Sequence, residues 1–151
     1  MVSRIEISEE HLARIEALAR DAFPYECCGL LIGVGRNPDS AVRVTRIAES
    51  RNLAAPERMD RFEIDPALQF SLMRELRGSD EAIIGVYHSH PNGRATPSPR
   101  DLEDARDPSL IWLVTAVSHG TDQAGANTKA FELATDLTRF NEIPIRLSDG
   151  A

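Results

Sequence analysis

The 151-residue chain has few cysteines and lacks long apolar runs, and each shortage excludes a class of protein. Its two cysteines, Cys27 and Cys28, are adjacent, and neighbouring residues cannot reach the geometry of an ordinary disulfide. No disulfide framework is therefore expected. The longest apolar stretches are too short to cross a bilayer, and residues 1–23 carry frequent charges instead of a signal-peptide core. We therefore expect a cytoplasmic protein that does not enter a membrane.

Positive charge is also in short supply. The chain has 17 Lys and Arg against 24 Asp and Glu, which gives a net charge of −7. Nucleic acids and anionic membranes are bound through basic surfaces, so neither is expected as a partner. Hydrophobic residues make up 42% and charged residues 27%, which is typical of a soluble globular chain. The length predicts a single domain over residues 1–151.

Apolar runs and helix signals alternate along the chain. Helices are predicted from Ser8 to Pro24, from Asp65 to Gly78 and from Ser98 onward, because each starts with a capping residue. Strands are predicted at 28–34, 41–47 (after a turn at 37–40), 61–64, 82–87, 110–117, 129–134 and 143–147, with a loop at 49–60. Strands that alternate with helices indicate an α/β domain with a largely covered sheet. In the second helix the residues expected to face the core are Leu68, Met73 and Leu76, with Phe70 and Leu72 as further candidates.

Two histidines end the apolar run at residues 82–87. His88 and His90 are two positions apart, so on a strand their side chains share a face and can grip one metal ion. Asp101, at the start of the third predicted helix, is a plausible third ligand. Two histidines and a carboxylate leave the fourth position of a tetrahedral zinc open to water, as a catalytic zinc site requires.

A zinc-bound water also needs a group that takes its proton. Glu26 is the candidate, because it precedes a buried strand and is not easily buried without a partner. Ser98 has two possible roles: it can cap the helix, or its hydroxyl can donate a hydrogen bond to the oxyanion of a tetrahedral intermediate. The two are compatible if the oxygen accepts one bond while the hydrogen points at the substrate.

These residues occur in an order that resembles a known family. Glu26-Cys27-Cys28-Gly29-Leu30-Leu31 is followed by His88-Ser89-His90-Pro91 and then by Pro97-Ser98-Pro99-Arg100-Asp101. The pattern resembles the JAMM motif of the MPN-domain metallopeptidases, in which a glutamate precedes H-x-H-x7-S-x-x-D, and is most similar to the short prokaryotic members. The resemblance covers nearly the whole chain. It implies an α/β MPN fold with a mixed curved sheet flanked by helices, layered as in cytidine deaminases.

The resemblance also assigns roles. It implies one zinc ion per chain held by His88, His90 and Asp101, with Glu26 as general acid and base and Ser98 as oxyanion stabiliser. It implies a peptidase or isopeptidase that cuts after the C-terminal glycine of a ubiquitin-like or sulfur-carrier protein. The loops 49–60 and 92–97 are expected to shape a groove for an extended Gly-Gly tail, which an edge strand can pair with. A homodimer is possible.

Other interpretations stay open at this point. A non-catalytic MPN scaffold would have lost motif residues, and this chain keeps them all. A zinc deaminase expects H-x-E and P-C-x-x-C, which are missing. A zinc hydrolase of an unrelated small substrate also fits the sequence. Cys27 and Cys28 lack the spacing of thiolate ligand pairs, so one is expected in the core and the other near the site.

Overall fold

The computed structural model describes residues 2–35, 41–118 and 127–148. The turn predicted at 37–40 lies outside these residues. Three helices and eight strands are assigned in the described part of the chain. In chain order they are β1 (Ile5–Ser8), α1 (Glu9–Ala22), β2 (Cys28–Val34), β3 (Val42–Ser50), α2 (Pro66–Glu75), β4 (Ala82–His90), α3 (Pro99–Asp104), β5 (Ile111–Ala116), β6 (Asn127–Leu133), β7 (Phe140–Ile143) and β8 (Ile145–Ser148).

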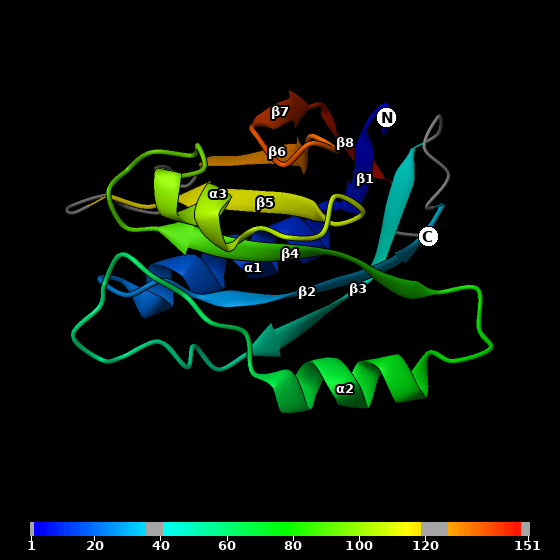
Figure 1. Cartoon of the computed structure of the whole chain (residues 1–151), viewed down its shortest axis with the longest axis horizontal. Coiled ribbons are helices and arrows are strands. Elements are labelled where there is room, and N and C mark those ends of the chain that lie inside the picture. The colour runs from blue at the N-terminus through cyan, green and yellow to red at the C-terminus, as the bar shows by residue number, and fades with distance from the viewer. Residues whose placement is uncertain (1, 36–40, 119–126, 149–151) are drawn as a thin grey trace.

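The eight strands form one mixed sheet in the order β7-β6-β5-β4-β2-β3-β1-β8. β4 pairs with β5 in parallel and with β2 in antiparallel orientation. β7 and β8 lie at opposite ends of this order, yet only Pro144 separates them in the sequence. The sheet must therefore curve until its two ends approach each other, and Figure 1 shows β7 and β8 on the same side of the molecule.

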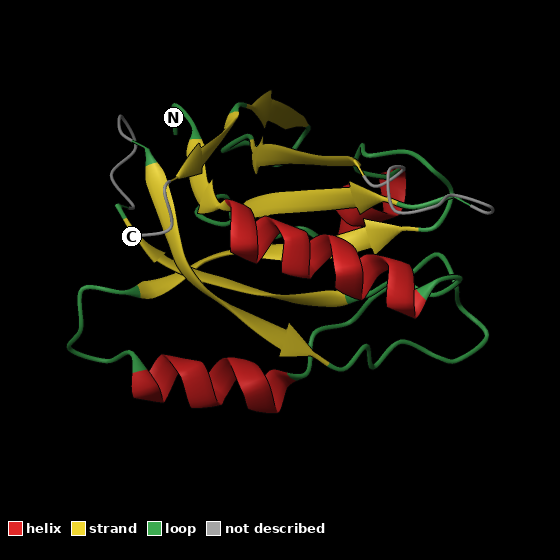
Figure 2. Cartoon of the chain, turned by 180° about the vertical axis from the view of Figure 1, so that it is seen from behind, coloured by secondary structure: helices red, strands yellow, loops and turns green. Residues whose placement is uncertain are grey.

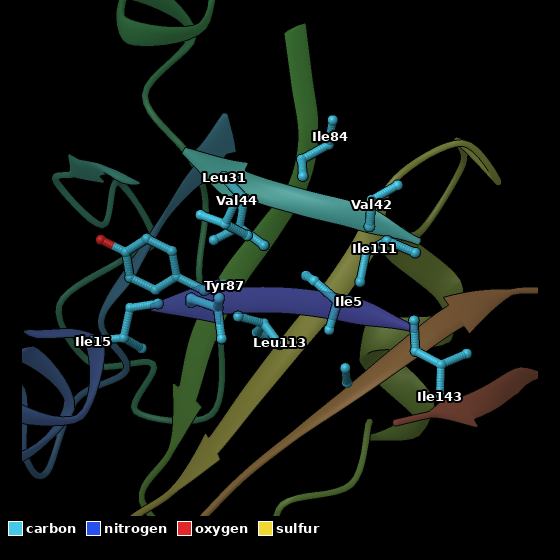
Figure 3. Packing of buried hydrophobic residues seen from close by; sticks show 12 residues of the cluster. Ile5, Ile15, Leu31, Val42, Val44, Ile84, Tyr87, Ile111, Leu113 and Ile143 are labelled. Carbon is cyan, nitrogen blue, oxygen red and sulfur yellow. The ribbon is translucent and has the colours of Figure 1, made fainter. Parts of the chain in front are cut away.

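Helices cover both faces of the central strands. Figure 2 shows α1 lying across one face of the sheet and α2 lying apart from it, below the strands in this view. On the α1 face, Ile15 packs with Leu31, Tyr87 and Leu113 in a core that also takes in the sheet ends. Figure 3 shows Ile5 of β1 and Ile143 of β7 in that same core, as the curvature requires. On the opposite face a second core is built mainly from α2 and the outer sides of β2, β4, β5 and β6: Leu30, Ile32, Leu72, Leu76, Val86, Ala105, Trp112, Val114, Phe131 and Leu133.

Most of the predicted elements are present. The helices start at the predicted caps: the side chains of Ser8, Asp65 and Ser98 each accept a hydrogen bond from a backbone N–H in the first turn. The strands at 28–34, 82–87 and 110–117 are confirmed as β2, β4 and β5. β3 extends to Ser50, three residues beyond the predicted end. The fold class is α/β, as predicted.

Three predictions about local structure were wrong, and one strand was missed. β1 was not predicted, because a strand of four residues that ends on the helix cap Ser8 carries little periodic signal. Residues 61–64 form an isolated bridge between Asn52 and Ile64 instead of a strand. The strand predicted at 143–147 is split between β7 and β8. Met73 and Phe70 are exposed, because the sheet contacts only the side of α2 that carries Leu72 and Leu76.

Among the described residues, no helix is both long and apolar enough to cross a membrane.

Candidate metal centre

The C-terminal end of β4 carries the two histidines. Within this strand His88 and His90 point to the same face, and both are buried. Their Nε2 atoms lie 3.0 Å apart. The strand places them beside the start of β2, because Cys28 is the register partner of His88. The predicted pair of imidazoles is therefore formed, at a strand end in the centre of the sheet.

Asp101 reaches the same point from the first turn of α3. Its Oδ2 lies 3.2 Å from Nε2 of His88 and 3.0 Å from Nε2 of His90. The same oxygen accepts a hydrogen bond of 2.8 Å from the backbone N–H of Ser98, and the Ser98 hydroxyl accepts one from the Asp101 N–H. This reciprocal pair is a capping box, and it fixes the carboxylate against the helix start.

The three atoms fit a zinc ion. Ligand atoms bound at about 2.0–2.1 Å around a tetrahedral zinc are about 3.3 Å from one another. The observed separations of 3.0, 3.0 and 3.2 Å are close to that value. Burial acts to raise the pKa of Asp101, but the neighbouring imidazoles of His88 and His90 outweigh it and hold that pKa well below its usual range while no metal is bound. The carboxylate is therefore ionised, as a metal ligand must be.

The two imidazole rings are held in different ways. Nδ1 of His90 lies 3.1 Å from the carbonyl oxygen of Arg94, which acts as an acceptor for its ring N–H. Nδ1 of His88 has no hydrogen-bond partner among the described residues. The His88 ring is fixed by packing instead: Phe62 stacks on it with a centroid distance of 4.3 Å, and Trp112 meets it edge-on at 5.4 Å.

Glu26 lies beside this cluster. Its side chain is buried, and its Oε1 has no hydrogen-bond partner among the described residues. Glu26, His88 and His90 each bring a possible ligand atom to within 4.8 Å of the others. The Oδ2 atom of Asp101 lies 3.2 and 3.0 Å from the Nε2 atoms of His88 and His90, which suits a third ligand. Burial raises the pKa of Glu26 to about 8, which suits a group that accepts and returns a proton near neutral pH.

A pocket of about 350 Å³ opens onto the cluster. Both loops predicted to flank the site contribute to its wall, through Met59 and Asp60 from one and Asn92 from the other. Ser98 also lines the pocket while it caps α3, so its two possible roles are spatially compatible. The remaining lining residues are Phe23, Pro24, Glu26, His90 and Pro91.

The structure thus brings together all five residues that the sequence singled out. It also adds contacts that the sequence did not reveal: the Phe62 ring on His88, the Arg94 carbonyl on His90, and an amide–carbonyl hydrogen bond of 3.0 Å from Asn52 to the Glu26 backbone. No local pattern marks these residues. Cys28 is buried and Cys27 is half-buried before β2, and both thiols are free.

Comparison with known proteins identifies the family. The profile of "Prokaryotic homologs of the JAB domain" matches residues 8–133. The chain belongs to this family. It is a JAMM-type hydrolase with an MPN fold. The JAB1/MPN domain protein AF2198 of Archaeoglobus fulgidus shares that fold, with a TM-score of 0.55 at 18% identity over 93% of this chain and 98% of that one.

Several known proteins are similar over most of the chain. The desampylase of Haloferax volcanii is 29% identical over 116 residues, which are 74% of this chain and 80% of that protein. The CysO-cysteine peptidase of Mycobacterium tuberculosis is 31% identical over 101 residues, which are 66% of this chain and 64% of that protein. The solution structure of DSY2949 from Desulfitobacterium hafniense has a TM-score of 0.77 at 32% identity, over 96% of this chain and 93% of that one.

Proposed function

We propose that this JAMM hydrolase is a zinc-dependent peptidase or isopeptidase that cuts after the C-terminal glycine of a ubiquitin-like or sulfur-carrier protein. One observation carries the proposal. Nε2 of His88, Nε2 of His90 and Oδ2 of Asp101 lie 3.0–3.2 Å from one another, and beside them the buried Oε1 of Glu26 has no hydrogen-bond partner among the described residues. The names of two similar proteins, a desampylase and a CysO-cysteine peptidase, support the substrate class.

In this proposal His88, His90 and Asp101 hold the zinc ion. Bound zinc supplies a water whose pKa is lowered to about 7 and a Lewis acid for the scissile carbonyl. The chain keeps the three ligands in place by separate means: ring packing for His88, the Arg94 carbonyl for His90 and the capping box for Asp101. Such outer contacts orient the ligands before the metal arrives.

Glu26 moves the proton in this proposal. Its unpartnered Oε1 takes the proton from the attacking water and then delivers it to the departing amine, so the carboxylate is regenerated at the end of the cycle. The raised pKa of Glu26, about 8 because of burial, makes both transfers possible near neutral pH. Asp101 cannot share this task, because in this proposal its Oδ2 is a zinc ligand and the same oxygen accepts the hydrogen bond from the Ser98 N–H.

Ser98 is proposed to stabilise the oxyanion. Its oxygen accepts the Asp101 N–H at 3.1 Å, which leaves the hydroxyl hydrogen available for the carbonyl oxygen of a substrate in the pocket. A glycine-rich tail suits this pocket, because glycine brings no side chain and lets the substrate backbone approach Glu26, His90 and Ser98 closely.

The test is a cleavage assay with the zinc-loaded protein. A ubiquitin-like sulfur carrier extended beyond its C-terminal Gly-Gly is incubated with wild type and with Glu26→Gln, and intact mass spectrometry follows the carrier. Loss of the extension with wild type alone is the expected result. An unchanged carrier mass with zinc still bound would reject this substrate class and leave the metal site standing.

A further inference from the structure

The peptide group that joins Glu26 to Cys27 is held from two sides by side chains of other segments. The Glu26 carbonyl oxygen accepts a hydrogen bond of 3.0 Å from Nδ2 of Asn52. The Cys27 N–H donates one of 2.8 Å to Oγ of Ser89. The carbonyl and the N–H belong to one planar unit, so the two bonds together fix the orientation of that plane. The Cα atom of Glu26 lies in the same plane, so the two bonds constrain the point from which the Glu26 side chain leaves the backbone.

Ser89 ties this peptide group to the strand that carries the histidines. It lies between His88 and His90 on β4, and its side chain is buried. Because alternate residues of a strand face opposite sides, the Ser89 hydroxyl points away from the metal side, toward Cys27. The Ser89 N–H also donates to the Cys27 carbonyl at 3.1 Å. Substitution of Ser89 can therefore disturb Glu26 without removing a ligand.

Asn52 ties the same peptide group to the loop that follows β3. Both of its amide hydrogens are used, one for Glu26 and one for the Arg61 carbonyl at 3.0 Å. Its Oδ1 accepts from the N–H groups of Ala54 and Glu63, each at 3.0 Å. All four hydrogen-bonding positions of the amide are thus filled. No other residue type offers two donors and a double acceptor on so short a side chain.

We infer that Asn52 and Ser89 are positioning residues that clamp the Glu26–Cys27 peptide group and so aim the Glu26 carboxylate at the water beside His88 and His90. The carboxylate has an oxygen without a hydrogen bond of its own, so its place depends on the backbone to which it is attached. A displacement of about 1 Å in such a group can cost about 100-fold in rate. The inference rests on the proposed function, in which Glu26 transfers the proton.

The first test compares Asn52→Ala and Ser89→Ala with wild type in cleavage of the extended carrier. Each variant is expected to lower kcat by about 10- to 100-fold, with KM and bound zinc within about twofold of wild type. Ser89→Thr, which keeps the hydroxyl, is expected to recover most of the rate. A loss of rate that parallels loss of zinc, or no loss at all, would overturn the inference.

Ser50→Ala is the matched control. The Ser50 hydroxyl also bonds the backbone near this loop, accepting from the Asp65 N–H at 2.9 Å and donating to the Arg51 carbonyl at 2.7 Å. It bonds the Cys28 thiol as well, but among the described residues it has no hydrogen bond to Glu26 or Cys27. The kcat of the Ser50→Ala variant is expected to stay within about twofold of wild type. A drop equal to that of Asn52→Ala would mean that general loosening of the loop, and not the clamp, causes the loss.

A second readout needs no substrate. Amide hydrogen exchange of Cys27 reports the clamp directly, because its N–H is one of the two clamped groups. Asn52→Ala is expected to speed Cys27 exchange by at least about fivefold, the equivalent of one ordinary hydrogen bond, with the Val86 amide of β4 unchanged. If wild type fails to cleave the carrier, the proposed function fails, yet faster exchange still supports the clamp. Unchanged Cys27 exchange overturns it.

Discussion

Nε2 of His90 and Oδ2 of Asp101 lie 3.0 Å apart, and both atoms present lone pairs when the imidazole is neutral. The Arg94 carbonyl can only accept a hydrogen bond, so the ring proton of a neutral His90 belongs on Nδ1, 3.1 Å away. A cation between Nε2 and Oδ2 satisfies both atoms at once. The Arg94 carbonyl therefore prepares His90 for metal binding from the far side of its ring.

Asp101→Asn should separate metal binding from helix capping. The amide oxygen can still accept the Ser98 N–H, so α3 should remain capped, but the charged ligand oxygen is lost. Zinc affinity is expected to fall by more than the roughly 10- to 100-fold seen for outer-shell partners, at nearly unchanged thermal stability of the metal-free protein. Zinc titration against a competing chelator measures the affinity. Wild-type affinity would rule Asp101 out as a ligand.

Glu26→Gln should keep the metal and lose turnover. Gln has nearly the same shape and fits the same buried space, but it cannot take a proton. The expected loss in kcat is about 10²- to 10⁴-fold, the usual contribution of a general base. Single-turnover kinetics at saturating zinc measure it, with zinc content determined on the same sample. Activity near that of wild type would require another base.

Ser98→Ala and Ser98→Gly together should separate the two roles of this residue. Glycine is a tolerable N-cap, whereas alanine costs about 1 kcal/mol at that position. Both variants lack the hydroxyl, so both should lose about 10²- to 10³-fold in rate if Ser98 stabilises the oxyanion. Only Ser98→Ala should show a clearly lower stability in urea. A rate loss in Ser98→Ala that Ser98→Gly does not share would reduce Ser98 to a cap.

Phe62→Ala should weaken the metal site from outside it. Phe62 stacks on the His88 ring, whose Nδ1 has no hydrogen bond to orient it among the described residues. Removal of the stacked ring is expected to lower zinc affinity by about 10- to 100-fold, as loss of an outer-shell partner does. Phe62→Tyr keeps the ring and serves as the control. Equal affinities of the Ala and Tyr variants would show that the packing does not orient His88.

Gly85→Ala should destabilise the whole sheet. A Cβ at this position of β4 would lie 2.3 Å from the carbonyl oxygen of Ile111 on β5, and backbone cannot move aside without loss of strand pairing. We expect a loss of about 1–3 kcal/mol in the free energy of unfolding, typical of an overpacked core. Urea denaturation measures it. Unchanged stability would show that the Ile111 carbonyl oxygen leaves room for a Cβ at position 85, so that β4 and β5 are farther apart than in this structure.

The sequence alone determined the ingredients of the site and most of the elements. Caps at Ser8, Asp65 and Ser98 and the apolar runs of β2, β4 and β5 are local signals, because capping and burial act within a few residues. His88 and His90 are two positions apart on one strand, and this spacing alone predicts that both side chains lie on one face, whatever the rest of the fold is.

Only the tertiary structure decided what surrounds those residues. Phe62 meets His88, and Asn52 meets Glu26, across 26 residues of sequence in each case, through loop placement that no periodicity encodes. Phe70 and Met73 are exposed because α2 touches the sheet along a narrow stripe, and β1 exists because β3 and β8 pair with it on both sides. Such contacts depend on strand order and sheet curvature, which are fixed by packing between distant segments and not by the preferences of neighbouring residues.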